Sequence, residues 1–412
     1  MDNFLIFISL TLFAFSGYLV WPSRYNVVTH GTVAGGFISI IVPSLILGVP
    51  DKYPPEIVDL YTRVLTVGIL FFLPGLVAGF FWGRRLPTRF SFDVMATEDY
   101  EQRVIRITRW FMMAGIIGLA LSYAGMGFMP VFASEPIAAK LFRGQYQAPY
   151  LRVAVLFRVS FFLISTITPI ACIIWYKTRS KLFLFLIVAG LFLMIASLQR
   201  SGAFSGLVFA FIIVMSFKSR LRFAVLMLIL IGVFIMSSFF YYIVGVRTFE
   251  SGKDVWEVIG ESAPDIDDQM QFMVKFDQAP VWTYGRTMYG GLIPGHYQWN
   301  PSVYTLNIIA PGRDVNDVGS GGLRLPLPLW GYVSFQWVGV IVFSLFTGVL
   351  SGIFLGVLKT WIKKYDSIII RSTAIIAFAA VTGPFIGFTL LNMFAIPPAL
   401  IMLFYLYRIS WK

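Results

Sequence analysis

Long apolar segments recur along the whole chain, and this pattern constrains the fold more than any other feature of the sequence. A membrane-spanning helix needs about 20 largely apolar residues. On that scale the sequence predicts about 11 spans, which begin near Asn3, Val27, Arg63, Ile107, Val153, Leu182, Ala203, Phe223, Leu329, Ile368 and Met393. Only 13% of the residues are charged, too few for the surface of an ordinary soluble protein. The predicted fold class is therefore an all-α multi-pass membrane protein.

The spans follow one another without a separate polar domain, so we expect a single polytopic membrane domain over residues 1–412. The longest polar segment within it is a loop over residues 246–328. The N-terminal stretch lacks the basic region and small-residue cleavage site of a signal peptide, which predicts a retained first span. A single cysteine, Cys172, lies in an apolar run, so no internal disulfide can form.

Lysine and arginine residues indicate how the spans are oriented, because they concentrate on cytoplasmic loops. The connector after the third span alone contains Arg84, Arg85, Arg89, Arg103, Arg106 and Arg109. Alternation from this loop places every short basic loop on the same side, with the N-terminus outside and the C-terminus in the cytoplasm. The net charge of +12 thus follows from orientation in the membrane, and we expect no nucleic-acid partner.

The outer face carries the long loop, a loop of intermediate length over 130–152 and a very short one at 199–202. Loops as long as 246–328 are uncommon in compact proteins unless they have a function or are disordered. This loop is rich in Trp and Tyr, so we expect it to pack on itself or on the bilayer. Residues 254–276 predict an amphipathic helix, whereas the Gly- and Pro-rich second half predicts irregular structure.

Eight arginines lie at or just beneath this predicted outer face, where the orientation rule disfavours them. They are Arg143, Arg152, Arg158, Arg200, Arg247, Arg286, Arg313 and Arg324. The planar guanidinium donates two parallel hydrogen bonds to a phosphate, so a cavity with several of them would suit a lipid-linked diphosphate. The alternative is that each arginine pairs with one of the ten acids of the long loop or with an anionic lipid.

Arg158 and Arg200 have the most informative positions among the eight. Arg158 lies inside the fifth predicted span, where a charge is costly unless it is paired or lines a wet cavity. The alternative interpretation is that the Arg158 side chain extends back to the bilayer surface. Arg200 lies in the turn SLQRSGAFSG, whose small residues let a ligand or another helix approach the backbone. It is equally open to a structural reading.

His296 is the candidate general base, because a neutral histidine can take a proton from an attacking hydroxyl. Asp314 is an alternative proton acceptor, and a loop histidine with no role is also possible. His30 is read as structural. Aromatic side chains of the long loop, among them Tyr289 and Trp299, suit either an interfacial belt or a platform for sugar rings. No histidine or cysteine spacing supports a metal site.

The arrangement resembles the Wzy-type O-antigen or oligosaccharide repeat-unit polymerases, which are related to the O-antigen ligases in the polytopic GT-C-like superfamily. The matching segments are LQRSGAFSG with Arg200, YGRTMYGGLIP over 284–294, and GGLRLPLPLWGYVSFQWVGV over 321–340. The last segment resembles a Gly-rich re-entry into a span. Residue by residue, the resemblance extends to Arg200, Arg286 and His296.

The resemblance implies a GT-C-like fold with a long periplasmic loop and a metal-independent glycosyltransferase of the bacterial inner membrane, with no cofactor. A growing glycan on undecaprenyl diphosphate would be the donor, and one repeat unit on the same carrier the acceptor. The product would be O-antigen of lipopolysaccharide or another surface polysaccharide. The partners would be these lipid-linked glycans and membrane lipid, with room for a chain-length regulator protein.

Other functions remain open from the sequence. An O-antigen ligase would share the fold and the donor but use a lipid A core acceptor. A flippase or another transporter of lipid-linked glycans should show internal repeats and polar sites at the bilayer midplane, and neither is evident. A structural partner in a biosynthetic complex is a further alternative.

Overall fold

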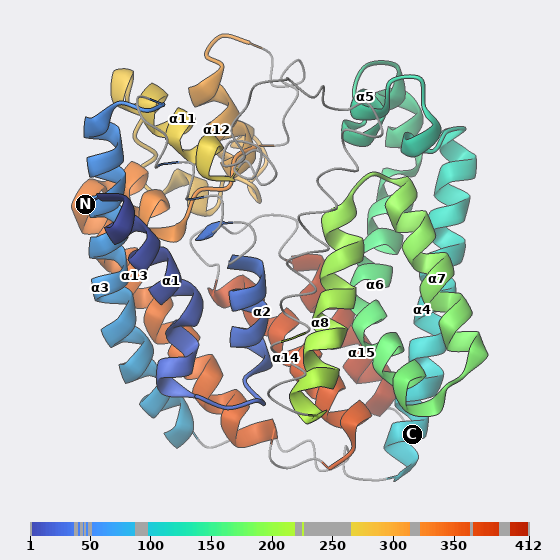
Figure 1. Cartoon of the computed structure of the whole chain (residues 1–412). Helices are drawn as coiled ribbons and strands as arrows, with labels where there is room; N and C mark the ends of the chain where they lie inside the picture. The colour runs from blue at the N-terminus through green and yellow to red at the C-terminus, as the bar shows by residue number, and fades with distance from the viewer. Residues whose placement is uncertain are drawn as a thin grey trace. The chain divides into compact units, whose positions relative to one another are not determined.

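A computed structural model describes residues 2–36, 40–41, 44, 47, 52–86, 98–218, 225, 265–313, 322–362, 366–386 and 396–410. This part of the chain is predominantly helical and contains no β-strand (Figure 1). The helices form two compact units, which we describe separately. The first unit contains α1 (Asp2–Val20), α2 (Val27–Gly36), α3 (Pro55–Arg85), α11 (Asp265–Gln278), α12 (Pro301–Ile309) and most of α13 (Leu327–Trp361).

The second unit is built around α4 and α6, which pack along each other. It contains α4 (Glu98–Met126), α5 (Pro136–Leu141), α6 (Gln147–Thr178), α7 (Lys181–Ala196), α8 (Arg200–Lys218), α15 (Ile396–Ser410) and most of α14 (Ile368–Ile386). Small residues bring α4 and α6 close, since a Cβ on Gly118 would lie 2.2 Å from the Ser160 hydroxyl oxygen. Thr108 of α4 and Tyr405 of α15 share a buried hydrogen bond of 2.8 Å.

Four helical segments in the described residues are long and apolar enough to cross a membrane: Pro55–Arg85, Asp99–Phe132, Gly144–Thr178 and Leu327–Trp361. Shorter apolar helices are also present. For the described residues, the prediction of an all-α fold with apolar helices long enough to cross a membrane is thus confirmed, whereas the number of 11 spans stays a prediction. The span expected near Phe223 lies outside the described residues.

Three helices begin well before the starts predicted for their spans. The third predicted span starts at Arg63, but α3 begins at Pro55, where the proline occupies the first turn and Glu56 follows it. Proline tolerates this position because its missing N–H would have no partner there, and an acid favours the positive end of the helix dipole. The helices α4 and α6 likewise start before Ile107 and Val153. Hydropathy marks the apolar part of a helix rather than its ends.

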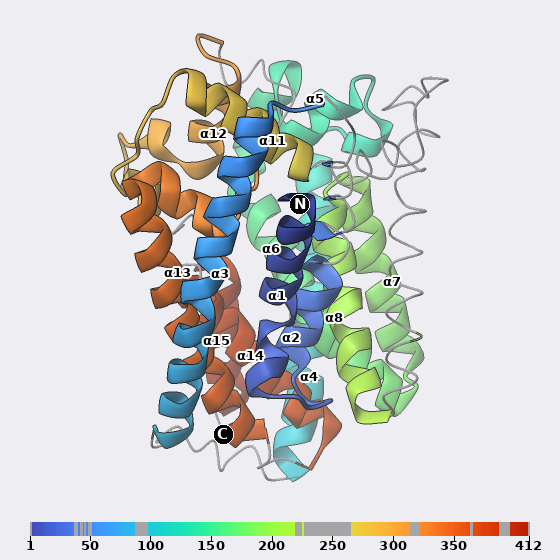
Figure 2. The same ribbon diagram turned by 60° about the vertical axis from the view of Figure 1, so that its left-hand side comes forward.

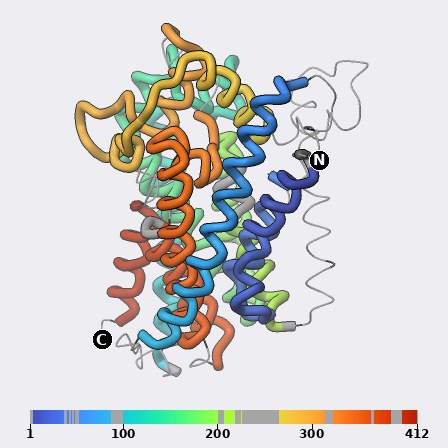
Figure 3. The backbone as a smooth tube through the Cα atoms, turned by 90° about the vertical axis from the view of Figure 1, so that its left-hand side faces the viewer, coloured from blue at the N-terminus to red at the C-terminus, as the bar shows by residue number. Residues whose placement is uncertain are grey.

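Glycines on both helices allow α3 and α13 to run in backbone contact (Figure 3). Gly75, Gly79 and Gly83 of α3 face the backbone of α13, and three α13 glycines face α3: Gly348, Gly352 and Gly356. A Cβ on Gly79 would lie 2.1 Å from the carbonyl oxygen of Val349. Residues four apart share one helix face, and small residues at that spacing let membrane helices pack closely. This close pairing determines how α3 and α13 lie against each other in the first unit.

Helix α13 is interrupted at Phe335 and Gln336, whose backbone angles are not helical (φ −143°, ψ 30° and φ 52°, ψ −140°). A Cβ on Gly339 would lie only 2.0 Å from the carbonyl oxygen of Gly331. Eight residues of continuous helix would separate these glycines by about 12 Å. The chain therefore reverses direction, and α13 is a helical hairpin with a short arm at 327–334 and a long arm at 337–361.

Helices α11 and α12 pack at the N-terminal end of α3 within the first unit (Figures 1 and 2). The apolar face of α11 buries Ile266, Met270, Met273 and Phe276, which confirms the amphipathic helix for 265–276. The rest of that prediction, residues 254–264, lies outside the described residues. Helix α12 occupies part of the loop that was predicted to be irregular, and its start is capped because the Asn300 side chain accepts a bond from the Ser302 N–H.

A buried polar network joins α3, α11 and the segment before α13. The Tyr61 hydroxyl donates to Oε1 of Gln269, and Nε2 of Gln269 donates to the Arg324 carbonyl oxygen at 2.7 Å. Both Tyr61 and Gln269 are buried. Since buried polar groups are costly without partners, this network fixes how α11 and the backbone at Arg324 pack beside α3.

Candidate functional site

The predicted site residues fall on both units. The first unit contains six described residues of the set, namely Arg286, Tyr289, His296, Trp299, Arg313 and Arg324. The second contains Arg143, Arg152, Arg158 and Arg200. Arg247, Asp314 and the side chain of Arg200 lie outside the described residues.

The loop after α11 is held against the hairpin of α13 by hydrogen bonds. The Thr283 N–H donates to the Val333 carbonyl oxygen at 3.0 Å, and the Thr283 and Ser334 hydroxyls lie 2.8 Å apart. Carbonyl groups near a helix C-terminus lack partners within the helix, so this loop completes the short arm. Gly285, with a φ of 75°, lies against the Phe335 ring, where a larger residue would be strained.

Two 3-10 turns in this loop, η6 (Arg286–Met288) and η7 (Tyr297–Trp299), bring four predicted site residues together. The Arg286 guanidinium lies over the Trp299 indole at 4.8 Å from the ring centroid, and the rings of Tyr289 and His296 are 5.8 Å apart. Gly290 permits this fold because a Cβ there would lie 2.4 Å from the Trp299 carbonyl oxygen. An arginine, two aromatics and a histidine thus share one short loop.

Arg286 is exposed and makes no ion pair with any residue that the structure describes. A guanidinium that contacts an aromatic face does not use its N–H groups as hydrogen-bond donors to a carboxylate there. They remain available to a phosphate. His296 is half-buried, and its side chain makes no hydrogen bond within the described part of the chain. Its ring can therefore meet a ligand.

Arg324 and Arg313 have different surroundings from Arg286. The charge of Arg324 acts on Asp265, in the first turn of α11, as the pairing alternative supposes. Burial raises the pKa of the Asp265 carboxyl above its ordinary value, and the attraction of Arg324 offsets only part of that rise. Arg313 is exposed just after α12.

Arg158 is anchored by a tyrosine in the second unit. Its Nε donates to the Tyr150 hydroxyl at 2.5 Å, two turns toward the start of α6. The Tyr150 ring stacks on Phe142, with centroids 3.8 Å apart. The guanidinium is thus directed back along the helix toward its N-terminal end.

The other arginines of the second unit are placed by their backbone. Arg143 directly follows Phe142 and is half-buried, while Arg152 is exposed in the second turn of α6. Arg200 is the first residue of α8. A cation at a helix N-terminus opposes the helix dipole, so helix stability does not explain the arginine there.

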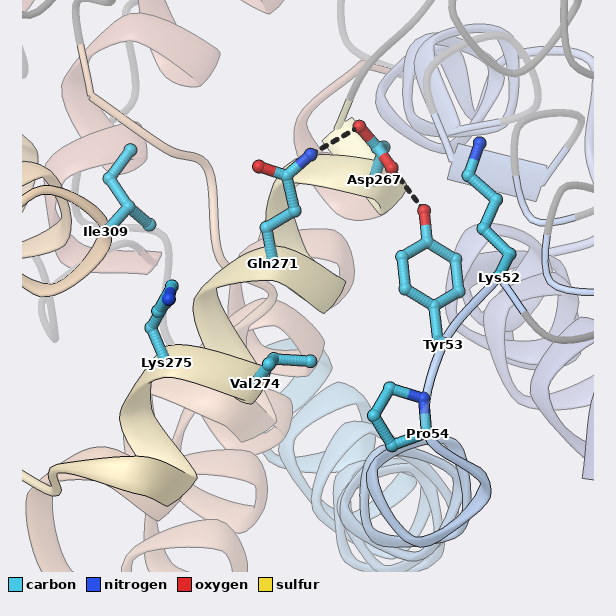
Figure 4. A pocket seen from close by; sticks show the side chains of 8 residues that line it. All are labelled: Lys52, Tyr53, Pro54, Asp267, Gln271, Val274, Lys275 and Ile309. Carbon is cyan, nitrogen blue, oxygen red and sulfur yellow. Dashed lines mark hydrogen bonds between the residues drawn. The ribbon is translucent and has the colours of Figure 1, made fainter.

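Sequence analysis missed a pocket of about 380 Å³ in the first unit (Figure 4). It lies between the residues just before α3 and one face of α11. Its lining is Lys52, Tyr53, Pro54, Asp267, Gln271, Val274, Lys275 and Ile309. None of the predicted site residues whose side chains the structure describes lines it. The sequence signal for this pocket was two lysines on the predicted outer face, where the prediction of anion-binding residues considered only arginines.

Comparison of the chain with protein-family models, with curated proteins and with solved structures gives no match.

Proposed function

We propose that this protein is a membrane glycosyltransferase that polymerises undecaprenyl-diphosphate-linked oligosaccharide repeat units into O-antigen or another surface polysaccharide. The proposal places the reaction on the outer face of the bacterial inner membrane. Its main support is the loop in which the exposed Arg286, which has no ion pair among the described residues, lies over Trp299, close in sequence to Tyr289 and His296. An unpaired guanidinium beside aromatic rings suits a ligand that joins a diphosphate to sugars.

In the proposed reaction, a hydroxyl of the acceptor repeat unit attacks the anomeric carbon of the donor glycan. The bond between that carbon and the diphosphate oxygen breaks, and undecaprenyl diphosphate leaves with the bonding electrons. Arg286 stabilises the negative charge that develops on the leaving diphosphate. His296 or Asp314 accepts the proton of the attacking hydroxyl. The charges balance without a further reactant.

Arg158 gives separate support from the second unit. Tyr150 holds its guanidinium in a fixed place by a hydrogen bond and by a ring 5.8 Å away. A positioned cation loses less conformational freedom when it binds an anion than a free one does. We propose that Arg158 and Arg200 also contact the lipid diphosphates.

The test is a reconstituted polymerisation assay with a purified lipid-linked repeat unit, read as a ladder of longer products. Arg286→Ala should lower the rate of elongation about 100-fold, and Arg286→Lys should restore it only in part because lysine lacks the planar fork. Arg63→Ala is the matched control, since Arg63 is an exposed arginine of α3 paired with Asp59 at 2.7 Å.

The assay also separates the alternatives. A ligase would transfer glycan to a lipid A core acceptor and leave the repeat unit unextended, and a transporter would move the substrate without changing its length. Full elongation by Arg286→Ala would show that this loop does not bind the diphosphate. Failure of the wild-type protein to extend any repeat unit, with normal surface polymer in a deletion strain, would rule out the polymerase.

A further inference from the structure

The pocket beside the start of α3 contains charged groups that the proposed reaction leaves without a role. Lys52 precedes α3 and Lys275 lies in the last turn of α11, on opposite sides of the pocket (Figure 4). Neither lysine forms an ion pair with the described residues. Among the described residues that line the pocket there is one carboxylate, that of Asp267, so two ammonium groups outnumber one acid. The lining therefore favours a ligand with negative charge.

Asp267 is held in a fixed position by two side-chain hydrogen bonds and can still accept others. The Tyr53 hydroxyl donates to its Oδ1, and Nε2 of Gln271 donates to its Oδ2 at 2.8 Å. Burial, followed by the bond to Asp267, raises the pKa of Tyr53, so the phenol stays a donor at neutral pH. A carboxylate can accept about four hydrogen bonds. Further acceptor positions thus remain beside the pocket, and hydroxyl groups are the donors they suit.

The remaining lining is apolar and small. Pro54, Val274 and Ile309 supply aliphatic surface, which can cover the C–H face of a sugar ring. The volume of about 380 Å³ leaves room for about one or two such rings. Carboxylate and amide acceptors, two ammonium groups and an aliphatic surface occur together here on one unit of the fold.

We propose that this pocket binds an acidic sugar residue of the glycan, meaning one that carries a carboxylate or a phosphate substituent. The ammonium groups of Lys52 and Lys275 meet the anionic substituent, and Asp267 and Gln271 accept bonds from ring hydroxyls. A divalent cation does not fit, because two lysines would repel it. The identification of the ligand as part of a glycan rests on the proposed function.

The test measures binding alone, with the full chain in phosphatidylcholine nanodiscs and calorimetry at low salt. The probes are tetragalacturonic acid, which is acidic, and maltotetraose, which is neutral. The acidic probe should bind at least about tenfold more tightly, and Lys52→Gln and Lys275→Gln should each weaken it about tenfold. Lys181→Gln is the matched control, since Lys181 is an exposed lysine at the start of α7 in the other unit.

Asp267→Asn distinguishes a sugar site from a simple anion site. Removal of a negative charge should strengthen binding of any plain anion. The proposal instead requires weaker binding of tetragalacturonic acid, because an amide accepts fewer hydroxyl bonds than a carboxylate does. Tighter binding by Asp267→Asn would therefore overturn it. Unchanged binding by the Lys52→Gln and Lys275→Gln double variant would do so as well.

Two further comparisons identify the source of any failure. Complete displacement of the probe when phosphatidylglycerol replaces part of the phosphatidylcholine would mark a lipid headgroup site and overturn the proposal. Binding as expected without any polymer ladder would leave this pocket as an acidic-sugar site and refute the polymerase alone. Ladder formation from acidic repeat units, with no lysine-dependent binding, would refute the pocket alone.

Discussion

Replacement of Gly79 by alanine tests the glycine interface between α3 and α13. The added Cβ would lie 2.1 Å from the Val349 carbonyl oxygen and 2.8 Å from its carbonyl carbon. Ordinary contacts begin near 3.4 Å, so the helices must separate by roughly 1 Å. Overpacking of this kind costs about 1–3 kcal/mol, and the better helix propensity of alanine returns about 0.5–1 kcal/mol. We expect a net destabilisation of about 1–2 kcal/mol.

The assay is thermal unfolding of the purified protein in one detergent, followed by tryptophan fluorescence. Gly79→Ala should lower the apparent melting temperature by a few degrees, and Gly79→Val should lower it further. Gly35→Ala is the control, because a Cβ on this helical glycine of α2 meets nothing within 4 Å. It should leave the melting temperature unchanged or slightly raised. Equal shifts for Gly79→Ala and Gly35→Ala would refute the close approach of the two helices.

Three other substitutions test the hairpin, the buried acid and the polar network. Gln336→Gly should raise the melting temperature, because a residue with a Cβ is strained at φ 52°, ψ −140°; a lower value would contradict the reversal at this point. The folded state raises the pKa of Asp265, so the stability that this group contributes is present at acidic pH and lost as its carboxyl ionises toward neutrality. Asp265→Asn should therefore stabilise the protein at pH 7 and have little effect at acidic pH, whereas equal effects at both pH values would argue against the buried carboxyl. Tyr61→Phe removes the donor to Gln269 and should cost about 0.5–1.5 kcal/mol of unfolding free energy, with no loss expected if the network is absent.

Helices were predictable because their cause is local. In a bilayer every backbone N–H and C=O must bond within its own segment, so apolar composition alone predicts a helix at each place. The amphipathic helix α11 was predictable from another local pattern, the spacing of Ile266, Met270 and Met273 on one helix face. The orientation inferred from the basic loops and the number of spans also come from local sequence patterns, and both remain predictions.

The candidate site was predictable only as a set of residue types. The sequence pattern singled out Arg286, Tyr289, His296 and Trp299, and the fold of one loop brings them together. It did not distinguish Arg286, which has no acidic partner among the described residues, from Arg324, whose charge acts on Asp265. The pocket between Lys52 and Lys275 was not foreseen, because its walls come from segments more than 200 residues apart.

By itself, the sequence determined that the described part of the chain is built of apolar helices, and it marked the loop over 246–328 as the most distinctive polar segment. The glycine patterns GLVAGFFWG and GVLSGIFLG were visible in it, but their pairing was not. The tertiary structure decided that α3 and α13 join through these glycines, that α13 reverses at Phe335, and that the loop docks on the hairpin. Composition controls whether a segment is a helix, because the backbone hydrogen bonds of a helix are made within the segment itself. Which helices meet depends on shape complementarity between distant segments, which no local pattern encodes.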